Sequence, residues 1–269
     1  MRARVRIAVF AVCWLIAMAA SAQRIERVAI EDFTWTELAT ALNAGKTTII
    51  VPIGGTEQNG PHMVLGKHNV RVKVLAERIA LALGNALVAP VIAYVPEGSI
   101  DPPAAHMRFP GTISVPDRTF ESVLESTARS FKRHGFRDIV FIGDHGSYQK
   151  NEQNVAARLN HEWAATPARV HAIVDYYELT QTRYRELLRR RGFRDDEIGT
   201  HAGLADTSLT LAVAPSLVRE DRFEAAASEA EKNGVHGDPR RSSAELGAIG
   251  IDVIVGETVN QIRNAVKRR

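Results

Sequence analysis

The sequence Val51-Pro-Ile-Gly-Gly-Thr-Glu-Gln-Asn-Gly-Pro-His-Met-Val-Leu-Gly-Lys-His68 joins an apolar run to a group of polar side chains. The run from Ile49 to Ile53 is rich in β-branched residues, which predicts a buried strand ending at two glycines. The polar residues that follow it are Glu57, Gln58, Asn59, His62 and His68. Because α/β folds build their sites at the carboxyl ends of strands, we expect this loop to carry function.

The first 22 residues have the pattern of a secretory signal peptide. Arg2, Arg4 and Arg6 precede an apolar run over residues 7–18, and small residues end at Ala22. The alternative is an uncleaved membrane anchor, but the apolar run is shorter than the ~20 residues that a span requires. We therefore expect cleavage after residue 22, a periplasmic or secreted location, and no membrane attachment of the mature chain.

Composition narrows the class of protein and the kind of site. The 269 residues are 45% hydrophobic and 24% charged, which is typical of a globular protein with a sizeable core. Loss of the leader removes three arginines and no acids from a net charge of +3, and no basic block indicates nucleic-acid binding. Cys13, the only cysteine, lies in the leader. A metal site in the mature chain must therefore use His, Asp, Glu or water, which favours zinc, manganese or iron.

Strand-like and helix-like segments alternate along the chain, which predicts an α/β fold with a mostly parallel sheet. We expect a single domain over residues 23–269, since no linker or repeat interrupts the pattern. The expected strands lie at 25–30 (a short edge strand), 47–53, 87–94, 138–142 and 170–176. The expected helices lie at about 36–42, then at 70–83, 117–134, 149–163, 178–191, 206–213 and 251–266, with 220–250 rich in loops. In the helix at 70–83, helical spacing predicts an apolar face and a charged, solvent-facing one. The apolar face holds Val70, Val74, Leu75, Ile79 and Leu83, and the charged face holds Arg71, Lys73, Glu77 and Arg78.

Acids and imidazoles recur in three loops next to expected strands or helices, at residues 57–68, 144–145 and 201–206. A single histidine is more often a hydrogen-bonded structural residue than a ligand. Several imidazoles with carboxylates at strand ends are nonetheless a common way to hold zinc or manganese without thiols. The pattern therefore predicts a metal site. The long loop at residues 95–111, which carries His106, is expected to be a lid or an oligomer contact.

Ser147 offers a rival catalytic arrangement, because it lies two residues after His145 and close to Asp144. No Gly-x-Ser-x-Gly elbow is present, and the three residues are too close in sequence for a normal triad. Gly54-Gly55 also lacks the further residues of a phosphate-binding loop. These patterns argue against a serine hydrolase and a nucleotide-binding site.

Five blocks of sequence, in order, resemble the creatininase family of metal-dependent amidohydrolases. They lie at residues 52–66, 109–114, 134–146, 201–208 and 234–239. The resemblance implies a three-layer α/β/α sandwich, a small-molecule substrate and a homo-oligomer, often a hexamer. It also implies a two-metal site in typical members.

The resemblance assigns roles to individual positions. Glu57 and His145 match metal ligands of the family, and His201 matches the loop histidine that assists catalysis. Asn59, His68 and Ser147 stand where the family has His, Asp and Glu. The ligand set that remains suits one metal ion rather than two, namely Glu57, His68 and His145 with Asp206. Asp144 and Asp206 are expected to ligate the metal or to orient an imidazole.

The function that follows is a metal-dependent hydrolase of a non-peptide C–N bond in a cyclic or small amide. Metal-activated water would attack the carbonyl, His201 would carry a proton to the leaving nitrogen, and Glu57 would serve the metal. The alternative is a non-catalytic binding or structural protein with the same fold and a degenerate site. His62 and His106 are expected either to line the pocket or to brace the loops.

Overall fold

The structure, a computed structural model, describes residues 27–267, so the predicted leader at 1–22 lies outside the described residues. Its centre is a parallel sheet with the order β2-β1-β3-β4. Thr48 of β1 pairs with Ala86 on one side and with Asp138 on the other. The strands are β1 (Thr48–Ile53), β2 (Ala86–Val88), β3 (Asp138–Gly143) and β4 (Arg169–Ala172).

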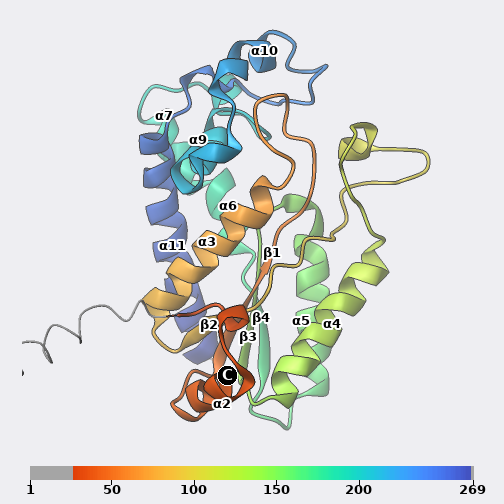
Figure 1. Cartoon of the computed structure of the whole chain (residues 1–269), viewed down its shortest axis with the longest axis vertical. Coiled ribbons are helices and arrows are strands. Elements are labelled where there is room, and N and C mark those ends of the chain that lie inside the picture. The colour runs from red at the N-terminus through yellow and green to blue at the C-terminus, as the bar shows by residue number, and fades with distance from the viewer. Residues whose placement is uncertain (1–26, 268–269) are drawn as a thin grey trace, which may run out of the picture.

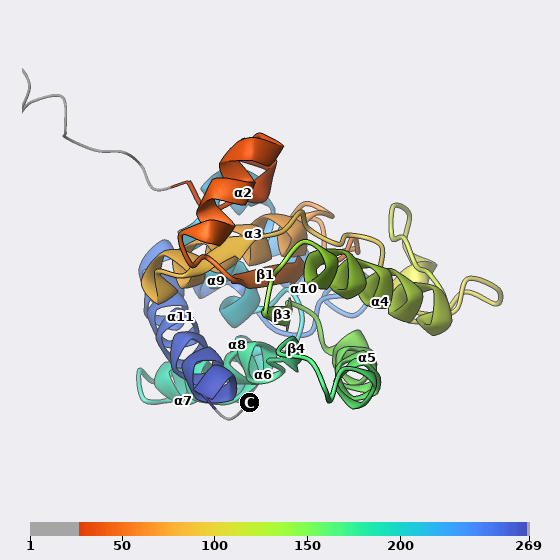
Figure 2. The ribbon, with the colours of Figure 1, turned by 90° about the horizontal axis from the view of Figure 1, so that it is seen from below.

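Both faces of the sheet are covered, which confirms the α/β/α sandwich (Figures 1 and 2). Ile49, Val51 and Ile53 of β1 pack with residues of α4 and α5 on one face. Ile50, one residue out of phase, packs with α3, α6 and α11 on the opposite face. Every residue of β1 and β3 is buried, as expected for central strands of a parallel sheet.

The helices follow the predicted alternation with the strands. The α-helices are α2 (Trp35–Asn43), α3 (Lys67–Leu83), α4 (Asp117–Arg133), α5 (Gln149–Glu162), α6 (Asp175–Gln181), α7 (Arg183–Arg189), α8 (Asp195–Ile198), α9 (Leu204–Val213), α10 (Phe223–Ser228) and α11 (Ala244–Lys267). Short 3₁₀ helices include η1 (Ile30–Asp32), η2 (Ala105–Arg108) and η3 (Gly146–Tyr148). Within residues 27–267, no helix combines the length and hydropathy needed to cross a membrane.

Three predicted strands are shorter than expected or absent. The strand at 87–94 ends at Val88, since Pro90 has no N–H for the ladder, and only a single bridge follows at Ile92. The strand at 170–176 stops at Ala172, before α6 begins. Of the edge strand at 25–30, the described part forms one bridge, from Ala29 to Val88, before η1.

Three predicted helices also differ from the structure. The helix at 178–191 begins earlier and is broken at Thr182, which separates α6 from α7. The helix predicted from residue 251 begins at Ala244, because Gly247 and Gly250 lie against neighbouring elements instead of ending it. On α3 the predicted faces are partly reversed: Arg71 is buried, whereas Val70 is exposed. The reason lies in the ion pairs of Arg71 described below.

Candidate metal and catalytic site

The site lies where β1 and β3 end beside each other, as the sequence predicted. Ile53 and Gly143 are paired in register, so the loops that follow leave the sheet at the same edge. Glu57 comes from the first loop and His145 from the second, and their Oε2 and Nε2 atoms lie 3.6 Å apart.

Glu57 is the centre of the site. Its side chain is fully buried, and its oxygens lie 2.7 Å from His68 Nε2, 3.2 Å from His106 Nε2 and 3.6 Å from His201 Nδ1. Burial raises the pKa of Glu57, but the hydrogen bond from His68 and nearby positive charges together hold it well below its usual value. Glu57 is therefore an anion around which four histidines gather.

Gln58 sets the tautomers of two of these histidines. Its amide orientation is fixed, because Gly60 N–H donates to Oε1 and Nε2 donates to the carbonyl of Gly234, both at 2.9 Å. His201 Nε2 lies 3.0 Å from the backbone carbonyl of Gln58, which can only accept, so this nitrogen carries the proton. Gln58 Nε2 lies 3.1 Å from both His201 Nε2 and His106 Nδ1. Because His201 Nε2 is itself a donor, the second Gln58 N–H goes to His106 Nδ1. His201 thus has its free nitrogen toward Glu57, whereas His106 has an N–H there.

His145 also presents a free nitrogen to Glu57. The hydroxyl of Ser147 donates to the carbonyl of Pro96 at 2.6 Å, so its oxygen accepts from His145 Nδ1 at 2.9 Å. The 3.4 Å approach of Ser147 N–H to the same nitrogen is the weaker contact. With the proton on Nδ1, His145 Nε2 faces Glu57 Oε2 with a lone pair. Burial lowers the pKa of His145 to about 4, so the ring is neutral at pH 7.

Two groups of three side chains among the described residues have the spacing of a metal site, and both include Glu57. The first adds His106 and His201, and the second adds Glu97 and His145, with ligand atoms within 4.8 Å of one another. In the first group His106 turns an N–H toward Glu57, which leaves no lone pair for a metal. The second group brings two carboxyl groups and an imidazole together, a donor set that fits a divalent cation. Burial and the nearby Glu57 raise the pKa of Glu97 to about 9, so a cation bound there would displace a proton from it.

His68 connects Glu57 to a second buried carboxylate. Its Nε2 lies 2.7 Å from Glu57, and its Nδ1 lies 2.6 Å from Asp144 Oδ2. Tyr176 also donates to Asp144, at 2.9 Å. Both nitrogens of His68 are within hydrogen-bond distance of carboxylates, and Arg71 also approaches Nδ1 at 3.2 Å, so neither nitrogen faces an open position for a metal in this arrangement. Asp144 orients an imidazole, one of the two roles predicted for it; the role of His68 as a ligand stays a prediction.

Asp206 is held by two buried cations that the sequence did not single out. Arg71 pairs with Asp206 Oδ1 at 2.6 Å and with Asp144 at 2.8 Å. Lys67 pairs with Asp206 Oδ2 and lies 3.8 Å from Glu57. Burial raises the pKa of Asp206, but these two cations hold it well below its usual value. The predicted role of Asp206 as a metal ligand stays a prediction, since its oxygens are already paired.

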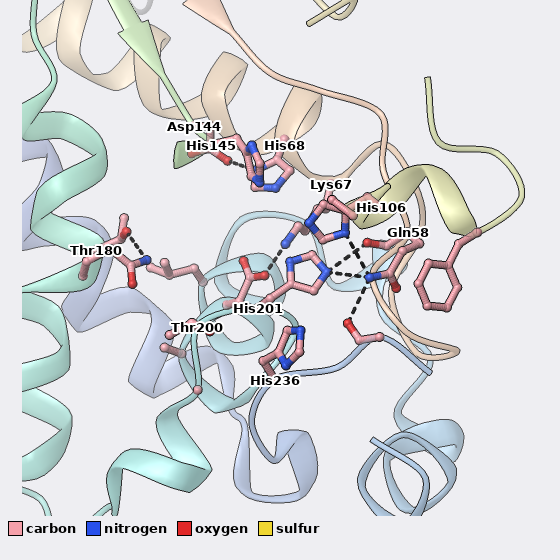
Figure 3. Close-up of a pocket in the computed structure, with 18 of the residues that line it drawn as sticks. Gln58, Lys67, His68, His106, Asp144, His145, Thr180, Thr200, His201 and His236 are labelled. Atoms are coloured by element: carbon pink, nitrogen blue, oxygen red, sulfur yellow. Dashed lines mark hydrogen bonds and ion pairs between the residues drawn. The ribbon is translucent and has the colours of Figure 1, made fainter. Parts of the chain in front are cut away.

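A cavity of about 660 Å³ opens above these groups (Figure 3). This volume lies in the range of small-molecule sites. Glu57 and Glu97 are buried behind its wall, whereas five imidazoles reach it directly. The polar residues that line it include Gln58, Lys67, His68, Arg71, His106, His145, Tyr177, His201, Asp206 and His236.

Strained and close-packed backbone positions hold two of the histidines. Ala105 and Ala202, the non-glycine residues with positive φ in the described part of the chain, adjoin His106 and His201. Such outliers persist where surrounding structure holds them, and they cluster at functional sites. A Cβ at Gly199 would approach the carbonyl of His236 to 2.1 Å, so only glycine lets the two loops meet.

The remaining predicted residues divide between the cavity and its supports. His106 lines the cavity, whereas His62 is buried away from it and bonds to Thr207 at 3.0 Å, so it braces the loops. The Ser147 triad does not form, because Asp144 contacts His68 and not His145. Sequence reasoning did not single out Glu97, whose one signal was its place in the long loop at 95–111.

Comparison with known proteins agrees with this geometry. A family model described as creatininase (creatinine amidohydrolase) matches residues 31–262. The creatinine amidohydrolase of Pseudomonas putida is 28% identical over 203 residues, covering 72% of this chain and 75% of that protein. A mycofactocin precursor peptide peptidase of Mycolicibacterium smegmatis is 26% identical over 270 residues, covering 90% and 93%.

Solved creatininase structures have the same fold as this chain. A structure described as "Creatininase Mn" superposes with a TM-score of 0.72 at 25% identity, covering 89% of this chain and 99% of that one. Another creatininase, described as "Zn-Zn type", superposes with a TM-score of 0.70 at 25% identity, covering 89% and 98%. The matched family model spans most of the sequence and the site lies at the predicted strand ends, so the chain belongs to the creatininase family of amidohydrolases.

Proposed function

We propose that the protein hydrolyses a C–N bond of a small or cyclic amide with the help of one divalent metal ion. The observation that carries the proposal is the 3.6 Å contact between Glu57 Oε2 and His145 Nε2. With the His145 proton on Nδ1, both atoms of this contact are hydrogen-bond acceptors. Two acceptors facing each other repel unless a cation lies between them. Ligand atoms about 2.0–2.1 Å from a tetrahedral zinc ion lie roughly 3.3 Å apart, so the spacing suits a shared ion.

Zinc, manganese and iron all suit a set of carboxylates and imidazole, and relatives of known structure are described with Mn and Zn. A cation held there would supply Lewis-acid polarisation of the scissile carbonyl and activation of water at neutral pH. Glu57 and His145 are the ligands that we assign first. His68 and Asp206 would join them only after leaving their present partners.

His201 is the residue that we expect to move a proton. Burial and the nearby Lys67 lower the pKa of His201 to about 3, so the ring is neutral at pH 7. Its Nε2–H is held by the carbonyl of Gln58, which leaves Nδ1 free toward the site. Nδ1 would take the proton released by the attacking water and deliver it to the leaving nitrogen.

Substrate size and class follow from the cavity. A volume of about 660 Å³ accommodates a small cyclic amide with room to spare. Because relatives are named for creatinine and for a precursor peptide, the assay needs cyclic amides, linear amides and short peptides.

The test is hydrolysis of that panel by the mature chain before and after chelation. We expect turnover of a small cyclic amide, loss with a chelator, and recovery with Zn²⁺ or Mn²⁺. Glu57→Gln should abolish turnover, and His201→Ala should lower kcat roughly 10²–10⁴-fold. His161→Ala, which changes an exposed histidine of α5, is the matched control. Full activity after complete metal removal would contradict the proposal.

A non-catalytic relative with the same fold is the second candidate. The buried pairs of Lys67 and Arg71 with Asp206 favour it, because they neutralise a carboxylate that a metal could otherwise use. Stoichiometric metal binding with no turnover on any member of the panel would support this reading.

Location and assembly are proposals as well. The leader supports export to the periplasm or the medium, and the mature protein should begin at Gln23 by mass spectrometry. The loop at 95–111 stands clear of the body in Figures 1 and 2. Ile100 within it (57%) and Tyr94 just before it (64%) are exposed apolar side chains, which supports a homo-oligomer. Light scattering should report a hexamer, the state implied by the family.

A further inference from the structure

Glu97 is a fully buried carboxylate that has no hydrogen bond to either oxygen. Its side chain is 0% exposed, and both Oε1 and Oε2 lack a partner in the described structure. Burying a carboxylate without partners is costly unless a cation or a proton balances it. The contacts around Glu97 therefore indicate which of the two it takes.

The backbone around Glu97 is held from three sides. Glu97 N–H donates to Ser114 Oγ at 3.0 Å, and Val115 N–H donates to the carbonyl of Val95 at 3.2 Å. The hydroxyl of Ser147 donates to the carbonyl of Pro96 at 2.6 Å. These hydrogen bonds fix the backbone on both sides of Glu97 and so hold its carboxylate in position.

Glu97 belongs to the metal group by position. One of its oxygens lies within 4.8 Å of the ligand atoms of Glu57 and His145. Its Oε2 is also 3.4 Å from Nδ1 of His145, the ring nitrogen that carries the proton. A Cβ at Gly55 would come within 2.5 Å of Glu97 Oε1. A glycine at position 55, in the turn after β1, therefore leaves the space that this carboxylate occupies. The free Oε2 of Glu57 and the bare Nε2 of His145 face the same space.

We propose that Glu97 is a ligand of the metal ion, completing a three-residue set with Glu57 and His145. This inference rests on the metal-dependent function proposed above. Ser147, at the position where the family resemblance predicts a carboxylate, does not ligate in this arrangement. It instead holds the Pro96 carbonyl and so positions the neighbouring segment that supplies the carboxylate.

The rival explanation is that Glu97 is a neutral, protonated acid. Glu97→Gln separates the two, because the amide copies the shape of the neutral acid but cannot replace a carboxylate ligand. Changes of residues behind a metal ligand weaken metal binding 10–100-fold, so loss of a ligand should raise the Kd at least about 100-fold. Glu97→Asp should recover part of the affinity.

The experiment measures Zn²⁺ and Mn²⁺ bound per chain, by elemental analysis after dialysis and by titration. Glu152→Gln is the matched control, because Glu152 is equally buried with both oxygens unpartnered but lies on α5 outside the metal group. We expect about one ion per chain in the wild type and in Glu152→Gln, and loss of that ion in Glu97→Gln. The circular dichroism spectrum should be unchanged in all three.

A second readout is spectroscopic. Co²⁺ bound to the wild type should give a visible spectrum that changes in energy for Glu97→Asp and disappears for Glu97→Gln. An unchanged Kd and spectrum in folded Glu97→Gln would overturn the assignment of Glu97 while leaving the proposed function intact. No metal in the wild type would overturn both.

Discussion

Single buried charges fix the positions of the side chains in the site. Arg71 is 95% buried and reaches two carboxylates, Asp144 just after β3 and Asp206 of α9. Those carboxylates in turn hold His68 and Lys67. A single guanidinium therefore fixes the geometry on one side of Glu57.

Replacing Arg71 with leucine should destabilise the protein strongly. The change leaves two buried carboxylates without their cation, which costs roughly 3–5 kcal/mol in the free energy of unfolding. Urea denaturation followed by circular dichroism measures it. Arg129→Leu, which removes an exposed arginine that also pairs with two carboxylates, should change stability little. Equal losses in the two variants would contradict the importance of burial.

Because Glu152 is buried, the free energy of unfolding should depend on pH. Burial raises the pKa of Glu152 well above 4.5, so the folded chain holds a proton that the unfolded chain releases. Its contribution to stability is therefore full below about pH 4.5 and decreases as pH rises toward the folded pKa. Glu152→Gln should remove this loss, and its advantage over wild type should grow by up to ~1.4 kcal/mol per pH unit. A difference that is constant from pH 5 to pH 8 would contradict the prediction.

At the scale of elements, helix contacts place the loops of the site. α9 begins just after His201 and carries Asp206, and α11 packs along it. The contact is close because Gly247 lies directly on the backbone of Ser208: a Cβ there would be 1.9 Å from the Ser208 carbonyl oxygen. The position of α9, and with it the His201 loop, depends on this absence of a side chain.

Gly247→Ala should consequently destabilise the protein, whereas Gly256→Ala in the same helix should not. Overpacking at position 247 is expected to cost roughly 1–3 kcal/mol. A Cβ added at Gly256 would meet no described atom within 4 Å, so alanine should stabilise by ~0.4–1 kcal/mol through helix propensity and the unfolded chain. Thermal unfolding of both variants tests the contrast, and a stabilised Gly247→Ala would refute the packing explanation.

For the whole molecule, metal binding and folding are linked. The three acceptors of the metal group come from segments far apart in the sequence, so the set exists only in the folded chain. An ion that binds only the folded state stabilises it by about 2.7 kcal/mol at a concentration 100 times its Kd.

Adding Zn²⁺ or Mn²⁺ to chelated protein should therefore raise the Tm by roughly 5–10 °C for a domain of this size. Scanning calorimetry with and without metal measures the shift. Glu57→Gln should keep the fold and lose most of the shift, whereas His161→Ala should retain it. A Tm that is independent of metal in the wild type would argue against a site in the folded chain.

The α/β alternation, the parallel sheet and the strand ends that carry Glu57 and His145 could all be predicted from the sequence alone. These features depend on local periodicity and on glycines that end strands, both of which are readable along a single segment. Element bounds were less secure, as at Pro90 and Thr182, because the ends of strands and helices depend on what packs beside them.

The composition of the site, by contrast, follows from how distant parts of the folded chain meet. Arg71 lies on a helix face that the pattern assigned to solvent, and its burial depends on Asp144 and Asp206, 73 and 135 residues away. Gln58 sets the tautomer of His106 through a carbonyl 176 residues distant. Glu97 can act as a metal ligand only because the fold brings it next to Glu57 and His145. Such roles arise from partners that converge in space, and no local pattern of residues encodes that convergence.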